Sequence, residues 1–398
     1  GGGAPLVAQT ETDASPPAKP SVTRIYPVDA TLLAIEIVEG EIEVMGQVEY
    51  VPQEGDRLEP SNNDVLAWDG TVPRWQPKGN RLVRQIDGEE VDLGYLIEHE
   101  GLIALHDRRL GENLNTAGLE TASTYTIRSE QDSGYAGEGQ SPLNVYRKSK
   151  PIDEKQYGGG QSVRHRVYLE LPQALKPGNS YRITIEGLNL ADESINYLHD
   201  PSSAWTEVIH VNQVGYHPMD GRKRALLSLW KGTGGSHDYD ALIGQPFSVV
   251  DIDSGIVVHT GTIQKLSDPE SADTTLSDGK NHAQTAIYSL DFSALRQPGQ
   301  FRLSVPGLGH SYPFPIKEST WLDAFRVSML GALHHRSGIE LGPPFTDYVR
   351  PINFHPNHGQ RVLQTDVTIL HGESAAIREA LTNIEGPVEE LAQAWGGY

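Results

Sequence analysis

The chain has 398 residues, of which 37% are hydrophobic, with 41 glycines, 26 prolines and a formal net charge of −21. This length predicts two or three domains, and the many turn-forming residues favour β-sandwich modules over helical bundles. The acidic charge argues against nucleic acid as a partner, because binding phosphate requires clustered Lys and Arg. The absence of cysteine excludes disulfides, thiolate metal sites and a cysteine nucleophile.

Residues 1–20, GGGAPLVAQTETDASPPAKP, are small, polar and proline-rich, which predicts a flexible tether. The segment resembles the stretch that follows the lipidated cysteine of a bacterial lipoprotein. That resemblance predicts a secreted protein, or an outer-membrane or periplasmic lipoprotein of a bacterium. An ordinary linker or an expression remnant is the alternative.

Residues 21–204 contain short β-branched and aromatic runs separated by turn residues, and they predict one antiparallel β-sandwich. Within them, 169–187 reads as a hairpin around Pro177 and Gly178. A basic cluster interrupts the strands, and it could touch an anionic sugar or a neighbouring domain, or form a solvated loop with locally paired charges. Its members are Arg147, Lys148, Lys150 and Lys155.

Residues 205–317 predict a second β-sandwich. The stretch FSVVDIDSGIVVHTGTI is typical of a hairpin, with Asp253, Ser254 and Gly255 between two β-branched runs. HSYPFPI predicts a last edge strand, because proline cannot donate to a ladder.

Residues 318–398 change to a helical period. The apolar residues Leu322, Phe325, Met329 and Leu333 recur at three- and four-residue steps, with Thr320 as the expected N-cap. Further helices are predicted over about 374–383 and from Pro387, the last one carrying Val388, Leu391 and Trp395 on one face. Three helices form a poor independent core, so they predict the opening of a larger helical domain.

Residues 208–229, VIHVNQVGYHPMDGRKRALLSL, carry the most specific pattern. They resemble the start of the immunoglobulin-like domain that precedes the catalytic barrel in many enzymes of glycoside hydrolase family 9. The matching residues are Asn212, Gln213, Gly215, Tyr216, Pro218 and Lys223.

Three later segments resemble the same family in the same order. LHHRSGIEL, 333–341, is similar to a Gln-Arg-Ser-Gly-Ile segment, with His335 in place of Gln. RPINFHPNHG, 350–359, is similar to an Arg followed by a Cys-His pair, with Phe354 in the Cys position and His355 in the His position. AWGGY, 394–398, resembles a Gly-Gly-Trp-Xaa stretch in altered order.

The resemblance implies a mainly β fold: two β-sandwich domains, the second immunoglobulin-like, followed by the first helices of a truncated (α/α)6 barrel. It implies the N-terminal part of a polysaccharide-degrading hydrolase that acts by inverting acid–base hydrolysis. In the family an Asp-Ala-Gly-Asp motif supplies the base and a distant Glu the acid, so no catalytic residue is expected within these 398 residues. The expected partners are a polysaccharide or oligosaccharide and the rest of the barrel, on the same or a second chain.

The loop that borders the sugar cleft in that family suggests three substrate contacts here, His355, Arg350 and Asp347, with loop structure and helix capping as the alternative. Tyr398 is a fourth candidate, because aromatic faces stack on sugar rings. Trp395 could also stack on a sugar, although a Trp at helix spacing is more often part of a core.

No substitute catalytic pair is found, because Glu389 and Glu390 are adjacent and the Asp238–Asp240 loop is typical of a plain turn or, at best, a calcium loop. No zinc spacing is present. No cofactor is expected to be required, although calcium is possible. A non-catalytic carbohydrate-binding or adhesin protein made of two sandwiches is the alternative function, and a purely bracing role for the sandwiches is a third.

Overall fold

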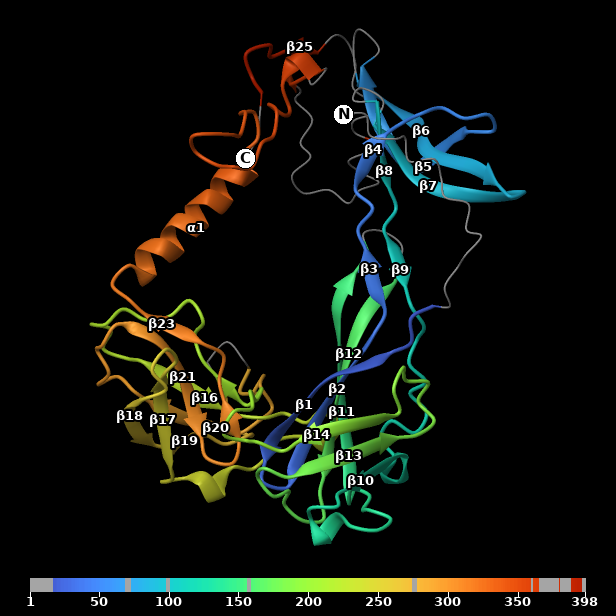
Figure 1. Cartoon of the computed structure of the whole chain (residues 1–398). Helices are drawn as coiled ribbons and strands as arrows, with labels where there is room; N and C mark the ends of the chain where they lie inside the picture. The colour runs from blue at the N-terminus through green and yellow to red at the C-terminus, as the bar shows by residue number, and fades with distance from the viewer. Residues whose placement is uncertain are drawn as a thin grey trace. The chain divides into compact units, whose positions relative to one another are not determined.

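The computed structural model describes residues 17–68, 73–97, 101–155, 159–273, 278–358, 361–364, 379 and 388–395, and within 60–79 it describes backbone alone. Strands dominate these residues, and α1 (Thr320–His335) is their longest helix (Figure 1). The predicted mainly β fold class is confirmed. Short 3-10 turns add η2 (Ala122–Thr124), η3 (Ser133–Tyr135), η4 (Gly232–Gly234), η5 (Asp240–Leu242) and η7 (Pro356–His358).

The first sandwich consists of two antiparallel sheets with the strand orders β1-β2-β12-β11 and β10-β13-β14. Its strands are β1 (Ser21–Asp29), β2 (Leu32–Glu39), β10 (Tyr125–Arg128), β11 (Asn144–Glu154), β12 (Gln161–Glu170), β13 (Ser180–Ile185) and β14 (Ser194–Leu198). Ile35 and Ile37 of one sheet and Ile183 of the other are fully buried in a common core. Alternation along the strands therefore directs one face of each sheet inward.

The predicted hairpin over 169–187 is wrong. β12 pairs with β11 and β2, whereas β13 pairs with β10 and β14. The turn at Pro177 and Gly178 therefore carries the chain from one sheet to the other. Both strands point apolar residues into the same core, and a crossover between the two sheets achieves this without pairing the strands.

Residues between β3 (Glu41–Glu43) and β9 (Arg108–Leu110) form a sheet of their own, rather than part of one sandwich over 21–204. β3 pairs with β9, and the sheet has the order β4-β8-β7-β6-β5. Its strands are β4 (Gln47–Glu49), β5 (Arg57–Trp68), β6 (Pro73–Ile86), β7 (Glu89–Ile97) and β8 (Leu102–Leu105). Asp87 and Gly88, with φ of 51° and 86°, form the tight turn between β6 and β7. β5 to β8 pair with their chain neighbours and β4 pairs with β8, so this stretch can form a separate sheet.

Residues 1–16 of the predicted tether lie outside the described residues. The residues that follow are bonded to the first sandwich, because Glu112 N donates to Ala18 O at 2.9 Å and Ala191 N donates to Pro20 O at 2.8 Å. The end of the predicted tether therefore belongs to the sandwich.

The second sandwich consists of the sheets β15-β16-β20-β19 and β18-β17-β21-β22, with β23 also paired to β21. Its strands are β15 (Ile209–His210), β16 (Arg224–Leu227), β17 (Pro246–Asp251), β18 (Val257–Thr262), β19 (Gln264–Ser267), β20 (Ile287–Asp291), β21 (Gly299–Val305), β22 (Gly309–His310) and β23 (Phe314–Ile316). The predicted hairpin is confirmed, because β17 pairs with β18. The predicted proline-containing strand is also confirmed as β23, which pairs with β21 and forms an isolated bridge to Tyr216 through Ile316.

The two sandwiches share one hydrophobic cluster. Tyr26 and Tyr168 of the first sandwich are buried in the same cluster as Tyr288 of the second. A hydrogen bond crosses the same junction, because Tyr239 OH donates to Val28 O at 2.6 Å. Shared burial of this kind predicts that the two sandwiches unfold together.

The basic cluster on β11 contacts the second sandwich, which supports the neighbouring-domain alternative. Lys148 Nζ lies 3.1 Å from Glu207 Oε2 and donates to Trp230 O at 3.1 Å. Arg147 N donates to Thr233 Oγ1 at 3.0 Å. The backbone edge of β11 is therefore partly covered by a loop of the second sandwich.

The helix predicted after Ser319 is confirmed as α1. Its predicted apolar stripe is open, since Leu322, Phe325 and Met329 are 50%, 58% and 49% exposed. Thr320 does not cap the helix as predicted, because its hydroxyl donates to the carbonyl oxygens of Tyr216 and Lys317. These carbonyls lie outside the helix, and so the hydroxyl ties the helix to the preceding sandwich.

The helix predicted from Pro387 is wrong over the described residues 388–395. β25 (Glu389–Glu390) pairs there with β24 (Leu363–Gln364). Of the helix predicted over 374–383, Glu379 is helical and the other residues lie outside the described part. The (α/α)6 barrel therefore stays a prediction.

Two buried histidines predict an acid-sensitive fold. His165 and His199 are 4% and 6% exposed, and burial lowers the pKa of both. In the unfolded chain a histidine has a pKa of about 6.5. As the pH falls through that value, the unfolded chain takes up protons that the folded chain does not. The free energy of unfolding should then decrease by up to about 1.4 kcal/mol per pH unit for each histidine.

Thermal unfolding between pH 7.5 and 5.5 measures this effect, with a lower midpoint expected at the acid end. Replacing both histidines by glutamine should flatten the dependence, because glutamine does not titrate. A dependence that the double variant leaves unchanged would assign the acid sensitivity to other groups.

Candidate functional site

The segment 208–229, here called the junction segment, begins the second sandwich and anchors the start of α1. Gly215 has φ of 102°, and a Cβ there would lie 2.4 Å from Pro315 O, so only glycine permits this close approach. Tyr216 N donates to the same carbonyl at 3.0 Å. The Tyr216 ring packs edge-on against Phe314, and its hydroxyl donates to Arg224 O at 2.9 Å. Glycine and tyrosine are therefore both required at this backbone crossing.

Asn212 closes the turn before Gly215. Its side chain accepts from Val214 N at 3.1 Å and donates to Gly215 O at 3.1 Å. This is an Asx turn, in which the asparagine side chain makes hydrogen bonds to the backbone of the turn. Gln213, by contrast, is exposed.

Lys223 is the most deeply buried cation of the junction segment, with 0% of its surface exposed. Its Nζ donates to the carbonyl oxygens of Pro218 at 3.0 Å, Asp220 at 2.7 Å and Ser293 at 3.2 Å. An ammonium group has three N–H donors, and all three have an acceptor here. The lysine therefore ties the turn after Tyr216 to the loop that follows β20.

The start of α1 is bonded to the same segment. Tyr216 O accepts from Lys317 N at 3.0 Å and from Thr320 Oγ1 at 3.1 Å. Trp321 Nε1 donates to Asp220 Oδ1 at 3.1 Å. The junction segment thus fixes where the helix begins. Asp220 and Trp321 were missed by the sequence reasoning, since their partnership spans 101 residues.

Arg350 is held at the end of α1. Its guanidinium donates to His334 O at 3.2 Å and to Arg336 O at 2.6 Å, and its backbone pairs with Leu341. A cation at a helix C-terminus satisfies carbonyls that have no partner within the helix and complements the helix dipole. The structure therefore gives Arg350 the capping role that the sequence left as an alternative to substrate contact.

The other residues predicted to contact substrate, His355, Asp347 and Tyr398, do not form one cluster in the described part of the structure. His355 accepts from Asn357 N at 3.1 Å, and its ring packs edge-on against Trp395 at 5.0 Å between centroids. Asp347 is exposed, and Tyr398 lies outside the described residues. His355 and Trp395 are therefore brought together, whereas Asp347 is not joined to them by any contact among the described residues.

Exposed aromatic rings are common in this loop region. Phe345, Tyr348, Phe354 and Trp395 are 81%, 52%, 51% and 45% exposed. Exposed rings of this kind offer stacking faces for sugars. The sequence reasoning missed Phe345 and Tyr348, although their aromatic side chains could have marked them as candidates for stacking on a sugar.

A matched set of variants separates the capping role of Arg350 from substrate contact. Replacing Arg350 with alanine should lower the free energy of opening of the last turn of α1 by about 1–2 kcal/mol, because two carbonyl oxygens lose a charged donor. Amide hydrogen exchange in that turn measures the effect, with Arg326→Ala as the control on the same helix. Unchanged exchange together with weaker oligosaccharide binding would contradict the capping role.

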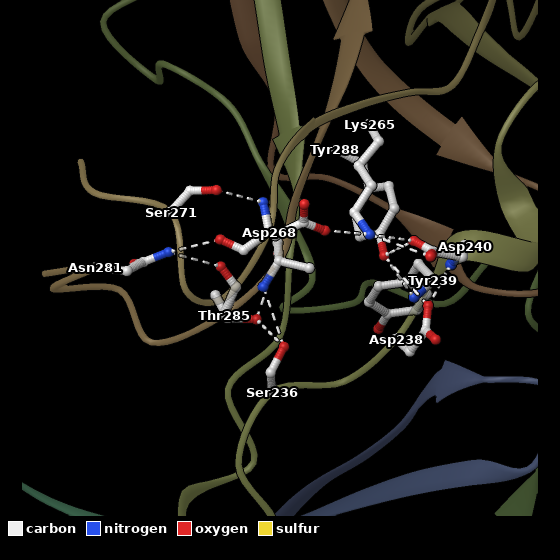
Figure 2. A network of polar contacts seen from close by, with 11 residues as sticks. Ser236, Asp238, Tyr239, Asp240, Lys265, Asp268, Ser271, Asn281, Thr285 and Tyr288 are labelled. Carbon is white, nitrogen blue, oxygen red and sulfur yellow. Dashed lines mark hydrogen bonds and ion pairs between the residues drawn. The ribbon is translucent and has the colours of Figure 1, made fainter.

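The loop considered as a possible calcium loop already holds a cation. Figure 2 shows Lys265 reaching Asp240, with its Nζ 2.9 Å from Asp240 Oδ1 and 2.6 Å from Asp268 Oδ1. The Tyr288 hydroxyl donates to Asp240 at 2.6 Å, and this bond together with Lys265 lowers the pKa of Asp240. The Asp238 carboxylate is also occupied, because its Oδ1 accepts a hydrogen bond from Asp240 N. The loop therefore reads as a structural turn.

Within the described residues, no group of three or more His, Asp or Glu side chains is placed to hold a metal ion. A calcium ion stays a prediction. In the same part of the chain, no helix combines the length and apolar character that crossing a membrane requires.

Comparisons with known proteins find similarity in the region that contains the junction segment. Residues 204–310 match the family described as the cellulase N-terminal ig-like domain. Endoglucanase D of Acetivibrio thermocellus is 27% identical over 151 residues, which are 38% of this chain and 19% of that protein. The chain therefore spans about a fifth of the length of this relative.

Two solved structures show the same partial likeness. A metagenome-derived glycoside hydrolase family 9 endoglucanase is 27% identical and covers 37% of this chain and 24% of its own, with a TM-score of 0.30. A Bacteroides ovatus GH9 protein is 23% identical and covers 37% and 22%, with a TM-score of 0.28. The family match over residues 204–310 confirms the predicted resemblance of this region to the immunoglobulin-like domain.

Proposed function

We propose that this chain is the N-terminal portion of a polysaccharide-degrading glycoside hydrolase of family 9, which cleaves glycosidic bonds with inversion. The match of residues 204–310 to the cellulase N-terminal ig-like domain carries this proposal. The contacts of Gly215, Tyr216 and Lys223 give a physical reason for the residues that carry the resemblance.

In the proposed reaction, one carboxylic acid protonates the leaving glycosidic oxygen. A carboxylate on the opposite face of the sugar removes a proton from water, and the two groups are about 6.5–9.5 Å apart. We place both groups on a helical barrel that α1 opens, on the same or a second polypeptide. This chain would supply structural support and part of the sugar-binding surface.

The support role rests on the contacts around the junction segment. The two sandwiches share a core, and Tyr216 and Asp220 bond to the start of α1. These contacts fix the residue at which α1 begins, and a barrel-opening helix needs such a fixed start.

The sugar-binding role rests on the loops after α1. Trp395 and Tyr348 present half-exposed rings, and His355 packs against Trp395. We propose that Trp395 stacks on a sugar ring while His355 positions it, with Tyr398 as a further contact. Asp347, which is exposed, would accept a hydrogen bond from a sugar hydroxyl.

The test follows the reading frame past Tyr398 and compares the longer polypeptide with the 398-residue chain. The longer polypeptide is expected to release reducing sugar from a soluble β-glucan, with the α-anomer formed first in proton NMR spectra. The 398-residue chain is expected to be inactive. Hydrolysis by the 398-residue chain, or first formation of the β-anomer, would overturn the proposal.

We further propose that the protein is exported from a bacterium and held at the cell envelope through residues 1–16. Their small, polar composition supports a tether. Labelling with radioactive palmitate in the native host tests the lipoprotein form, and a protein that stays unlabelled in the medium would support secretion instead.

A further inference from the structure

One end of the first sandwich contains a hollow of about 550 Å³. It lies where β2, β3, β11 and β12 meet. Its lining includes the aliphatic side chains of Val38, Ile42 and Ile152. Its polar lining consists of Glu41, Asp153, Ser162 and Arg164. Its volume is within the range of about 300–1,000 Å³ that small-molecule sites have.

Two small residues, Gly40 and Ser162, are part of the lining of the hollow. Gly40 has φ of 72° between β2 and β3, and Ser162 donates its hydroxyl to Gly40 O at 2.7 Å. A bulge between Pro151 and Asp153 on β11 changes the direction of the opposite wall. Bonded backbone therefore maintains the shape of the hollow.

Arg164 provides a donor with unused capacity. Its Nε lies 3.5 Å from Glu36 Oε1 but makes no hydrogen bond among the described residues. Glu36 itself already accepts from Thr23 at 3.0 Å and from Arg166 at 3.2 Å. The buried Nε is out of reach of a ligand, but the Arg164 side chain lines the hollow and is 32% exposed, so its terminal N–H groups can donate to a ligand there.

Two carboxylates provide acceptors. The Glu41 carboxylate is exposed and makes no hydrogen bond or ion pair among the described residues, and the Asp153 carboxylate accepts there only from Glu154 N, at 2.9 Å. A carboxylate can accept from two neighbouring hydroxyls at once. Two carboxylates beside one arginine would repel an anionic ligand.

We propose that this hollow binds a short, neutral saccharide. Glu41 and Asp153 would accept from its hydroxyls, Arg164 would donate to its oxygens, and the aliphatic floor would cover a C–H face of the ring. The inference rests on the proposed function only for the choice of glycans to be tested. Binding at the hollow needs no hydrolysis, so the two proposals can fail separately.

The test is isothermal titration calorimetry of the 398-residue chain with cellotriose, xylotriose and mannotriose, and with trigalacturonate as the acidic probe. At least one neutral trisaccharide is expected to bind. The double variant Glu41→Gln with Asp153→Asn should weaken that binding about tenfold or more, because charged acceptors are replaced by weaker ones.

Glu154→Gln is the matched control, since Glu154 is also exposed, follows Asp153 directly and does not line the hollow. It should leave the Kd unchanged. Thermal unfolding midpoints of all variants check that the fold is retained. The proposal is overturned if no neutral trisaccharide binds, if the double variant binds as tightly as the parent, or if trigalacturonate binds most tightly.

Discussion

Replacing Lys223 with alanine is expected to lower the free energy of unfolding by about 3–5 kcal/mol. The substitution removes a fully buried side chain and leaves the carbonyl oxygens of Pro218, Asp220 and Ser293 without their donor. Urea unfolding followed by circular dichroism measures the change. Because the same turn holds Trp321 through Asp220, the start of α1 should also lose amide protection.

Two comparison variants identify the cause. Lys223→Met keeps most of the buried stem and should recover the packing but not the three hydrogen bonds. Lys280→Ala removes an exposed lysine of the same sandwich and should have little effect. A Lys223→Ala variant that loses less than about 1 kcal/mol would show that water replaces the ammonium group easily.

Replacing Glu207 with alanine is expected to cost about 3–5 kcal/mol, because it breaks a largely buried charge cluster. Glu207 accepts from Arg166 at 2.8 Å and from the Tyr168 hydroxyl at 2.5 Å, and it lies 3.1 Å from Lys148. Its side chain is 8% exposed. Without Glu207, two cations would face each other at the junction of the sandwiches.

The same variant tests whether the sandwiches form one cooperative unit. In the parent protein, the shared core predicts a single unfolding transition for both. Glu207→Ala should weaken the junction and separate the transition into two in calorimetry. Glu207→Gln should cost less, because an amide oxygen can still accept one bond, and Glu186→Ala is an exposed control.

Burial also lowers the pKa of Lys148, and Glu207 opposes that shift. Removing Glu207 should therefore lower the Lys148 pKa further. A single transition that persists in Glu207→Ala, with little loss of stability, would assign the cohesion of the sandwiches to the apolar contacts alone.

Several elements could be predicted because their signals are local. The spacing of Leu322, Phe325 and Met329 predicted α1, and the turn residues near Gly255 predicted the β17–β18 hairpin. The prolines of β23 predicted an edge position. In the junction segment, the types and spacing of Gly215 and Lys223 are enough to indicate the family resemblance.

Other features depended on partners that are distant in the chain. The strands around Pro177 and Gly178 were predicted, but their assignment to different sheets was not. The spacing of Val388 and Leu391 indicated a helix, whereas the structure has β25 paired with β24. For Arg350 the sequence left substrate contact and helix capping open, and the helix terminus that it contacts is 16 residues away.

By itself, the sequence determined that the protein is mainly β, where its turns lie, where α1 begins and which family its junction segment resembles. These properties follow from the periodicity of apolar residues and from backbone preferences, both of which act over a few residues. The tertiary structure alone decided which strands pair, that β4 to β8 form their own sheet, and that Lys148, Arg166 and Glu207 meet between the sandwiches. Strand pairing and burial depend on contacts between segments that are far apart in the chain, and the local sequence of one segment does not specify its partner.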